Sequence, residues 1–299
     1  MYRLPPALRT VCGACVVLCA LLASLAVAQK PYSFDEAWRA HFFSRASYCK
    51  TRLISSWTCG PACRNVSNFR VTTIMYDYEM DTSGFMGLDH ANKQIVVAFR
   101  GANDIEKFLR EFSDTIVSYE LRYICGRRCS VNLDFSHAFA SLRDKTRSAL
   151  LQLIRANPTY EVLVTGHSLG GALAVLAAAD LQVQLNNLGG SPRYKPVSLY
   201  TFGAPRVGNS AFSRWVDALL AKGAKYRITH GRDPVVRIPS LWFGYMHTTS
   251  EVFYRTRSND SVVMCMDSPG LEDSECSIDM VSGWTEDHMN YLGDTVKCE

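Results

Sequence analysis

The spacing of apolar residues predicts one helix followed by three strands in the first third of the chain. Phe34, Trp38 and Phe42 recur at helical spacing, which predicts an amphipathic helix. That helix extends over residues 33–49, with Ser33 placed to cap its first turn. Runs rich in β-branched and aromatic residues then predict strands over 71–80, 85–89 and 94–101.

Further along, helical and strand patterns alternate. Predicted helices cover 136–158, 169–185 and 210–221, and predicted strands cover 160–166, 197–203 and 224–231. Such alternation is typical of a parallel sheet with crossover helices. We therefore expect an α/β fold with a mixed, mostly parallel central sheet, antiparallel at first, and helices on both faces. From Pro234 onward periodicity is weak, and a loop-rich region is expected.

The N-terminus reads as a secretory signal peptide. Two arginines precede a long apolar stretch that ends in the small-x-small triplet Ala26-Val27-Ala28, so cleavage is expected after residue 28. The stretch is long enough that an uncleaved anchor is the alternative. No later segment is expected to be apolar enough to span a bilayer, and without repeats or linkers residues 29–299 are interpreted as one domain.

Composition adds two constraints. The chain has 299 residues, 47% of them hydrophobic and 20% charged, as in an ordinary globular protein. Its formal charge of +4 falls by two when Arg3 and Arg9 leave with the signal peptide. Since there is also no basic run with interleaved aromatic residues, nucleic acid is not an expected partner.

Eight of the eleven cysteines lie beyond the signal peptide. An even number in a secreted chain implies disulfides, although eight cysteines allow about a hundred pairings. Three pairs are close enough in sequence to close short loops, which leaves a long-range fourth. The expected pairs are Cys59–Cys63, Cys125–Cys129, Cys265–Cys276 and Cys49–Cys298. The alternative, a zinc site built from the two C-x3-C pairs, is disfavoured in an oxidising compartment.

Two triplets, beginning at Asn65 and Asn259, match the acceptor pattern for N-glycosylation. Both are expected to lie at the surface of a secreted protein.

The segment Gly166-His167-Ser168-Leu169-Gly170 matches G-x-S-x-G. The bare pattern is common, but here a predicted strand ends where it begins and a helix of small residues follows, as a nucleophile elbow requires. Glycine is needed at 166 and 170 because side chains there would collide with nearby backbone. The alternative is a glycine-rich helix start of purely structural use. We interpret Ser168 as a nucleophile, with His167 pointing away from it.

A serine hydroxyl needs a base, and the base needs an orienting acid. Asp233 follows the predicted strand 224–231, so it should lie at the sheet edge that carries Ser168. His288 is the candidate base, because His230 and His247 are too close to Asp233 in sequence to approach it easily from another loop. The alternatives are an ordinary Asp-Pro turn and an exposed C-terminal histidine.

A second oxyanion donor should come from the loop after an early strand, here Arg100-Gly101-Ala102. A short helix is predicted next, with Asn103 as cap and Glu106 as its capping-box partner. Its apolar face consists of Ile105, Phe108, Leu109 and Phe112. This face predicts either a helix docked on the core or a lid that covers Ser168 and opens at a lipid surface.

Taken together, the motifs resemble the fungal-type class 3 lipase family across about residues 33–298. They are VVAFRG, GHSLGGALA, YTFGAPRVGN, HGRDPVVRIP, FGYMH and DHMNYLG. The resemblance implies an α/β-hydrolase fold, a triad of Ser168, Asp233 and His288, and no metal or cofactor. It also implies an oxyanion hole from the amides of Ala102 and Leu169, and a lid around residues 105–111.

Two residues depart from the family pattern. Ala102 stands where serine or threonine is usual, and Phe108 stands where the fungal lipases usually carry tryptophan.

The motifs and the resemblance together predict a secreted, monomeric triacylglycerol lipase acting at a lipid–water interface, exported or held in a lysosome-like compartment. Alternatives are a phospholipase A1 or a feruloyl or short-chain esterase using the same site, and a non-catalytic lipid-binding homologue.

Overall fold

The computed structural model describes residues 29–190, 193–256, 261–280 and 283–298. The predicted signal peptide, residues 1–28, and the predicted glycosylation site Asn259 lie outside these ranges.

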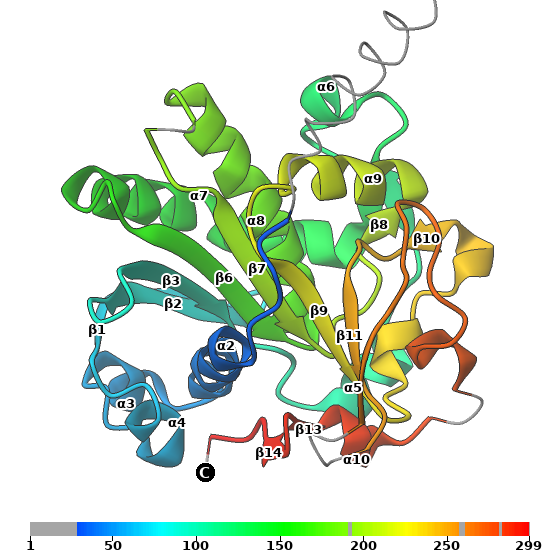
Figure 1. The fold of residues 1–299 in the computed structure, drawn as a ribbon, viewed down its shortest axis with the longest axis horizontal. Coiled ribbons are helices and arrows are strands. Elements are labelled where there is room, and N and C mark those ends of the chain that lie inside the picture. Colours follow the sequence, from blue (N-terminus) through cyan, green and yellow to red (C-terminus); the bar gives the residue numbers. More distant parts are fainter. Residues whose placement is uncertain (1–28, 191–192, 257–260, 281–282, 299) are drawn as a thin grey trace, which may run out of the picture.

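A central sheet of eight strands, in the order β1-β2-β3-β6-β7-β9-β11-β12, organises the described part of the chain (Figure 1). Strands β3, β6, β7, β9 and β11 run parallel, and the pairs at both ends are antiparallel. The expected mixed, mostly parallel sheet is therefore confirmed. The strands are β1 (Phe69–Asp77), β2 (Thr82–Asp89), β3 (Gln94–Phe99), β6 (Glu161–His167), β7 (Val197–Phe202), β9 (Lys225–His230), β11 (Glu251–Tyr254) and β12 (Val262–Met264).

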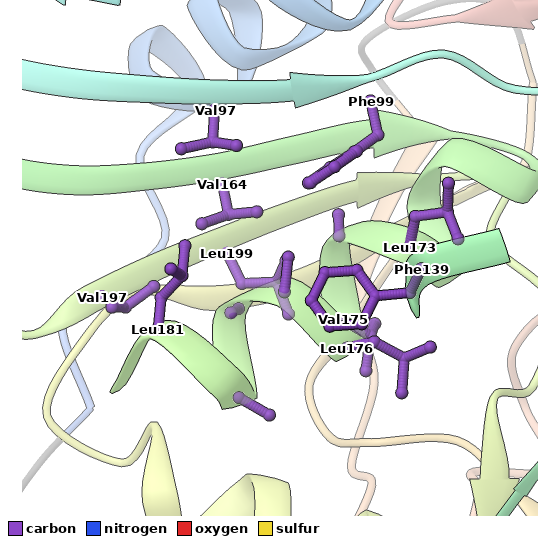
Figure 2. Packing of buried hydrophobic residues seen from close by; sticks show 14 of the residues in the cluster. Val97, Phe99, Phe139, Val164, Leu173, Val175, Leu176, Leu181, Val197 and Leu199 are labelled. Atoms are coloured by element: carbon purple, nitrogen blue, oxygen red, sulfur yellow. The ribbon is translucent and has the colours of Figure 1, made fainter. Parts of the chain in front are cut away.

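Helices cover both faces of the sheet because its strands alternate. In β3, Ile95, Val97 and Phe99 face one hydrophobic cluster, while Val96 and Ala98 face the other. Helices α7 (Leu133–Ala156), α8 (Leu169–Asn187) and α9 (Ser210–Leu219) pack on the first face, part of which Figure 2 shows. Helices α2 (Phe34–Ala46), α3 (Thr51–Ser55) and α4 (Gly60–Arg64) pack on the second.

Helix α8 lies in the core on nearly all sides, since almost every residue from Gly170 to Leu185 is buried. Its length and composition also fit a membrane-spanning helix, so the prediction that no segment after residue 28 is apolar enough to span a bilayer is wrong. Because 83% of its most apolar stretch is buried, this apolar character serves interior packing.

The region after Pro234 is less irregular than its sequence predicts. Strands β11 and β12 extend the central sheet, although β11 has only four residues and shows no period long enough to detect. Both before and after Pro234, short strands of the described residues form two further sheets, and short helices fill the connections. These elements are β4 (Ile116–Ser118), β5 (Ser130–Asn132), β8 (Gly208–Asn209), β10 (Tyr245–Met246), β13 (Asn290–Tyr291), β14 (Asp294–Thr295), α6 (Arg122–Cys125), η2 (Val235–Arg237), η3 (Leu241–Phe243) and η5 (Ser277–Asp279).

The parallel register places three loops at one edge of the sheet. Phe99 pairs with Gly166, His167 with Phe202, and the next strand ends at His230. The chain leaves all of these strands in the same direction, so the loops that follow them meet. This edge also carries α5 (Ile105–Glu111) and α10 (Thr285–His288) (Figure 1).

Candidate active site

Ser168 lies on the sharp turn between β6 and α8. Its φ of 57° and ψ of −130° form a conformation that non-glycine residues rarely adopt. A Cβ at Gly166 would lie 2.2 Å from the Gly170 carbonyl oxygen, and one at Gly170 would lie 2.3 Å from that of Phe99. These contacts confirm that both glycines are needed for close backbone approach.

His288 and Asp233 are joined by a buried hydrogen bond. The Nδ1 atom of His288 lies 2.8 Å from Oδ2 of Asp233. Since a carboxylate accepts, Nδ1 carries the hydrogen and Nε2 keeps a lone pair. The other oxygen of Asp233, Oδ1, accepts from the backbone amide of Val235 at 2.7 Å. The imidazole is thereby fixed in the tautomer that can remove a proton through Nε2.

Ser168 and His288 line one pocket of about 310 Å³, together with Ala102 and Ile105. Both residues are almost completely buried. The Oγ atom of Ser168 and Nε2 of His288 have no hydrogen-bond partner among the described residues, so the bond between them is not formed in this structure. Catalytic hydrogen bonds are often long in unliganded enzymes and shorten when substrate binds.

Two further residues, Tyr291 and Gly203, shape the environment of Asp233. The Tyr291 hydroxyl donates to Oδ2 of Asp233 at 2.5 Å, and burial together with that carboxylate raises the pKa of Tyr291 well above its usual value. Gly203, with φ of +58°, leaves no room for a side chain. A Cβ there would lie 2.7 Å from the Tyr291 hydroxyl, 2.8 Å from Asp233 Oδ2 and 3.0 Å from His288 Nδ1. Sequence patterns identified neither residue.

The other candidate histidines bond elsewhere. Nδ1 of His230 contacts the Asp287 carbonyl at 3.0 Å, and Nε2 of His247 contacts the Val236 carbonyl at 2.7 Å. The ring of His167 lies between Tyr48 and the backbone of His288.

The loop after β3 lies directly against Ser168. A Cβ at Gly101 would be 3.1 Å from that of Ser168, and the next residue, Ala102, lines the pocket. Leu169 begins α8, so its amide belongs to the helix N-terminus, where the positive end of the helix dipole lies. The two expected oxyanion donors therefore flank the nucleophile.

Helix α5 lies between the Ser168 pocket and a second one of about 420 Å³. Ile105 lines the first pocket and Phe108 the second, while Ala102 lines both. No residue of α5 is fully buried, and the side chains of its ion pairs Glu106–Arg110 and Lys107–Glu111 are largely exposed. A short helix with so little buried surface costs little to displace.

Contacts at both ends of α5 hold it in place. The prediction that Asn103 caps this helix is wrong, because Asp104 caps it by accepting from the amide of Lys107. Asn103 instead donates to Asp81 at 2.9 Å. Asn103 and Asp104 both have side-chain oxygens that can accept from the unpaired amides of the first helical turn, so the sequence could not decide which of the two is the cap. At the other end, Asn132 donates to the Ser113 carbonyl at 2.7 Å.

The structure contains four disulfides, Cys49–Cys298, Cys59–Cys63, Cys125–Cys129 and Cys265–Cys276. Both C-x3-C pairs are thus bonded, which removes the thiolates that a zinc site would need. One cluster of metal-ligand type occurs among the described residues, Glu251 with Cys265 and Cys276, but its sulfurs form a disulfide. Asn65 directly follows α4 and is exposed, as an acceptor asparagine must be.

Comparison with known proteins identifies the family. Residues 96–243 match the family model described as lipase (class 3), a stretch that includes Ser168 and Asp233. The chain belongs to the class 3 lipase family. Among solved structures, the Rhizomucor miehei lipase propeptide complex superimposes with a TM-score of 0.79 at 27% identity, covering 92% of this chain and 88% of that one.

A second solved structure is of a triacylglycerol lipase whose catalytic centre is formed by a serine protease triad. It superimposes with a TM-score of 0.80 at 29% identity, covering 91% of this chain and 99% of that one. These neighbours show that the chain has the α/β-hydrolase fold.

Curated relatives include two named lipases. Secreted mono- and diacylglycerol lipase A of Penicillium cyclopium is 33% identical over 71% of this chain, and the Rhizomucor miehei lipase is 31% identical over 84%. The aligned part of this chain spans 65% and 66% of the length of these two relatives.

Proposed function

We propose that this protein is a carboxylic-ester hydrolase of the lipase type that forms an acyl-enzyme at Ser168. The arrangement of Ser168, His288 and Asp233 carries the proposal. A buried serine on a strained turn shares a pocket with a histidine whose Nε2 is free and whose Nδ1 is bonded to a buried carboxylate. That combination activates a hydroxyl for attack on an ester.

The chemistry follows from these positions. Ser168 Oγ attacks the ester carbonyl carbon while Nε2 of His288 takes its proton, and Asp233 stabilises the imidazolium. The amides of Ala102 and Leu169 stabilise the negative oxygen of the tetrahedral intermediate. His288 then returns the proton to the leaving alcohol as the carbon–oxygen bond breaks. Water, activated by the same histidine, releases the fatty acid and restores Ser168.

The substrate is an acylglycerol at a lipid–water interface, triacylglycerol in the first instance. The half-buried apolar face of α5 supports this, because that face would be exposed favourably only against lipid. The Penicillium relative is named for mono- and diacylglycerol, so the number of acyl chains accepted is part of the test.

The protein is proposed to be secreted as a monomer, with a signal peptide over 1–28 and N-glycans at Asn65 and Asn259.

The substrate class is tested by comparing turnover of a long-chain triacylglycerol emulsion, diacylglycerol, phospholipid, feruloyl esters and soluble short-chain esters. The proposal predicts the highest kcat/KM on the acylglycerols. Dominant hydrolysis of phospholipid or feruloyl esters would instead assign the site to one of those activities.

Catalysis itself is tested by Ser168→Ala, with Ser148→Ala on the exposed side of α7 as control. The first should lose about 10⁴-fold or more in kcat, and the second should match the wild type. Unchanged activity of Ser168→Ala would refute the mechanism, and inactivity of the wild type on every ester would favour a lipid-binding protein.

A further inference from the structure

The mechanism above leaves one buried titratable side chain of the site without a role. His167, the last residue of β6, immediately precedes the nucleophile and is 1% exposed. Its Nε2 atom lies 2.7 Å from the backbone oxygen of His288, and its Nδ1 atom lies 2.7 Å from the Tyr48 hydroxyl. Both ring nitrogens are therefore bonded within the protein.

These partners fix the tautomer of His167. A backbone carbonyl can only accept, so Nε2 must donate to it and must carry the hydrogen. In the neutral ring Nδ1 then has a lone pair, which accepts the hydroxyl hydrogen of Tyr48. The His288 carbonyl therefore sets the tautomer, and the Tyr48 hydroxyl complements it by donating to the lone pair on Nδ1.

His167 is suited to lie beside a histidine that becomes charged. The two ring centroids are 4.4 Å apart. Burial, and next to it the neighbouring His288, lower the pKa of His167 well below its usual value. A neutral His167 does not compete for the serine proton and does not repel the His288 imidazolium.

Tyr48 joins this pair to the oxyanion loop. A Cβ at Gly101 would lie 2.0 Å from its hydroxyl oxygen, so the tyrosine packs tightly against the residue before Ala102. Cys49, which follows Tyr48 in the sequence, forms a disulfide with Cys298. Both Tyr48 and Cys298 line the Ser168 pocket. One chain of contacts therefore runs from the oxyanion loop through Tyr48 and His167 to the backbone of His288.

We propose that His167 and Tyr48 are positioning residues for ester hydrolysis: His167 holds the backbone of His288 so that Nε2 of His288 faces Ser168, and Tyr48 holds the His167 ring in the orientation that this bond needs. This inference rests on the proposed function, and it concerns the rate of the chemical step rather than substrate binding.

The first experiment measures kcat and KM on a soluble short-chain ester, normalised to active sites titrated with a phosphonate. His167→Leu removes the donor and should lower kcat about 10-fold while KM stays within about 2-fold. His167→Gln retains an amide donor near the Nε2 position and should restore kcat to within about 3-fold of wild type.

Matched controls separate positioning from general loss of packing. His41→Leu makes the same change at another buried histidine, on α2, and Tyr200→Phe removes a buried hydroxyl that donates to Glu36. Both should retain kcat within about 2-fold even where they lower Tm. If His167→Leu behaves like His41→Leu in kcat, the inference is wrong.

A double-mutant cycle tests whether Tyr48 acts through His167. Tyr48→Phe should lower kcat about 3-fold in the wild type and should have no further effect in His167→Leu, since the bond it supports is already gone. Equal effects in both backgrounds would show that Tyr48 acts independently of His167.

A readout without catalysis keeps this inference distinct from the proposed function. The ¹⁵N chemical shifts of the imidazoles in Ser168→Ala should show His167 neutral with its hydrogen on Nε2 at pH 7, and adding Tyr48→Phe should shift the Nδ1 resonance while the hydrogen stays on Nε2. A hydrogen on Nδ1 would overturn the inference whether or not the protein hydrolyses esters. Activity surviving in Ser168→Ala would overturn the proposed function alone.

Discussion

At the scale of single residues, the Asp233 carboxylate is the most crowded point of the site. It accepts from His288, Tyr291 and the backbone of Val235, with each of these side chains almost fully buried. Gly203 lies against the side chains of Asp233, His288 and Tyr291. The geometry of the acid–base pair therefore depends on a residue that has no side chain.

Gly203→Ala tests this dependence. The added methyl group must displace Asp233, His288 or Tyr291, and a displacement of about 1 Å at a catalytic group can cost about 100-fold in rate. We therefore expect kcat to fall about 100-fold. The matched control is Gly244→Ala, since Gly244 also has a positive φ, +80°, but has open space around its Cα. It should lose about 1 kcal/mol of stability and retain kcat. Equal activities of the two variants would contradict the crowding argument.

The residues that sequence patterns singled out are those whose chemistry restricts their type. Ser168 was found from G-x-S-x-G between a strand and a helix, and Asp233 and His288 from the order in which such acids and bases follow it. No role was predicted for Tyr48, His167, Gly203 or Tyr291, because their contacts join positions far apart in the chain, such as Tyr48 and His167, whose sequence separation is 119. No local pattern encodes such a contact.

At the scale of elements, long periodic segments were predicted well and short ones poorly. The predicted helix 136–158 is found as α7, Leu133–Ala156, because over twenty residues share its period. The cap of α5 was placed one residue too early, and β11 was missed. Helix α5 also contributes less apolar burial to folding stability than the core helices do, since none of its residues is fully buried.

The lid interpretation of α5 predicts a difference between emulsified and dissolved substrate. Phe108 would face lipid when α5 is displaced, so Phe108→Ser should lower activity on a triacylglycerol emulsion several-fold while changing that on a dissolved ester about 2-fold or less. Arg110→Ser, on the exposed side, serves as the control. Equal losses on both substrates, or a rate that saturates smoothly through the solubility limit, would count against a lid.

At the scale of the whole molecule, two features tie the site to global stability. The Cys49–Cys298 disulfide joins two residues that lie 249 positions apart in the sequence. It thereby links the Tyr48 region to the C-terminal segment after His288. In the chain-entropy model so long a loop contributes at most roughly 5 kcal/mol. The second feature is a set of buried histidines, His41, His167 and His247, whose pKa values burial lowers.

These histidines predict that the protein loses stability in mild acid. Burial, with Arg227 next, lowers the pKa of His247 to about 3, so it stays neutral in the folded state while the unfolded chain binds a proton below about pH 6.5. Stability is then present above the unfolded pKa and is lost as pH falls toward 3. Between pH 7 and 5 His247 alone should lower the free energy of unfolding by ~1–2 kcal/mol.

Denaturant unfolding at pH 7, 6 and 5 measures this slope, with His247→Gln as the comparison. Glutamine can still donate to the Val236 carbonyl but does not titrate, so its slope should be shallower. The lowered pKa of Glu272 acts in the same direction, but only below its unfolded value of 4.5, outside the window measured. Identical slopes in wild type and variant would rule out a contribution from His247.

The central claim is that Ser168 is a nucleophile activated by His288. It is tested most directly by treating the protein with a p-nitrophenyl alkylphosphonate and mapping the adduct by mass spectrometry. The account predicts one phosphonyl group per chain, on Ser168, formed about 10³-fold more slowly in His288→Ala. Labelling of another residue, or equal labelling of Ser168 in His288→Ala, would contradict it.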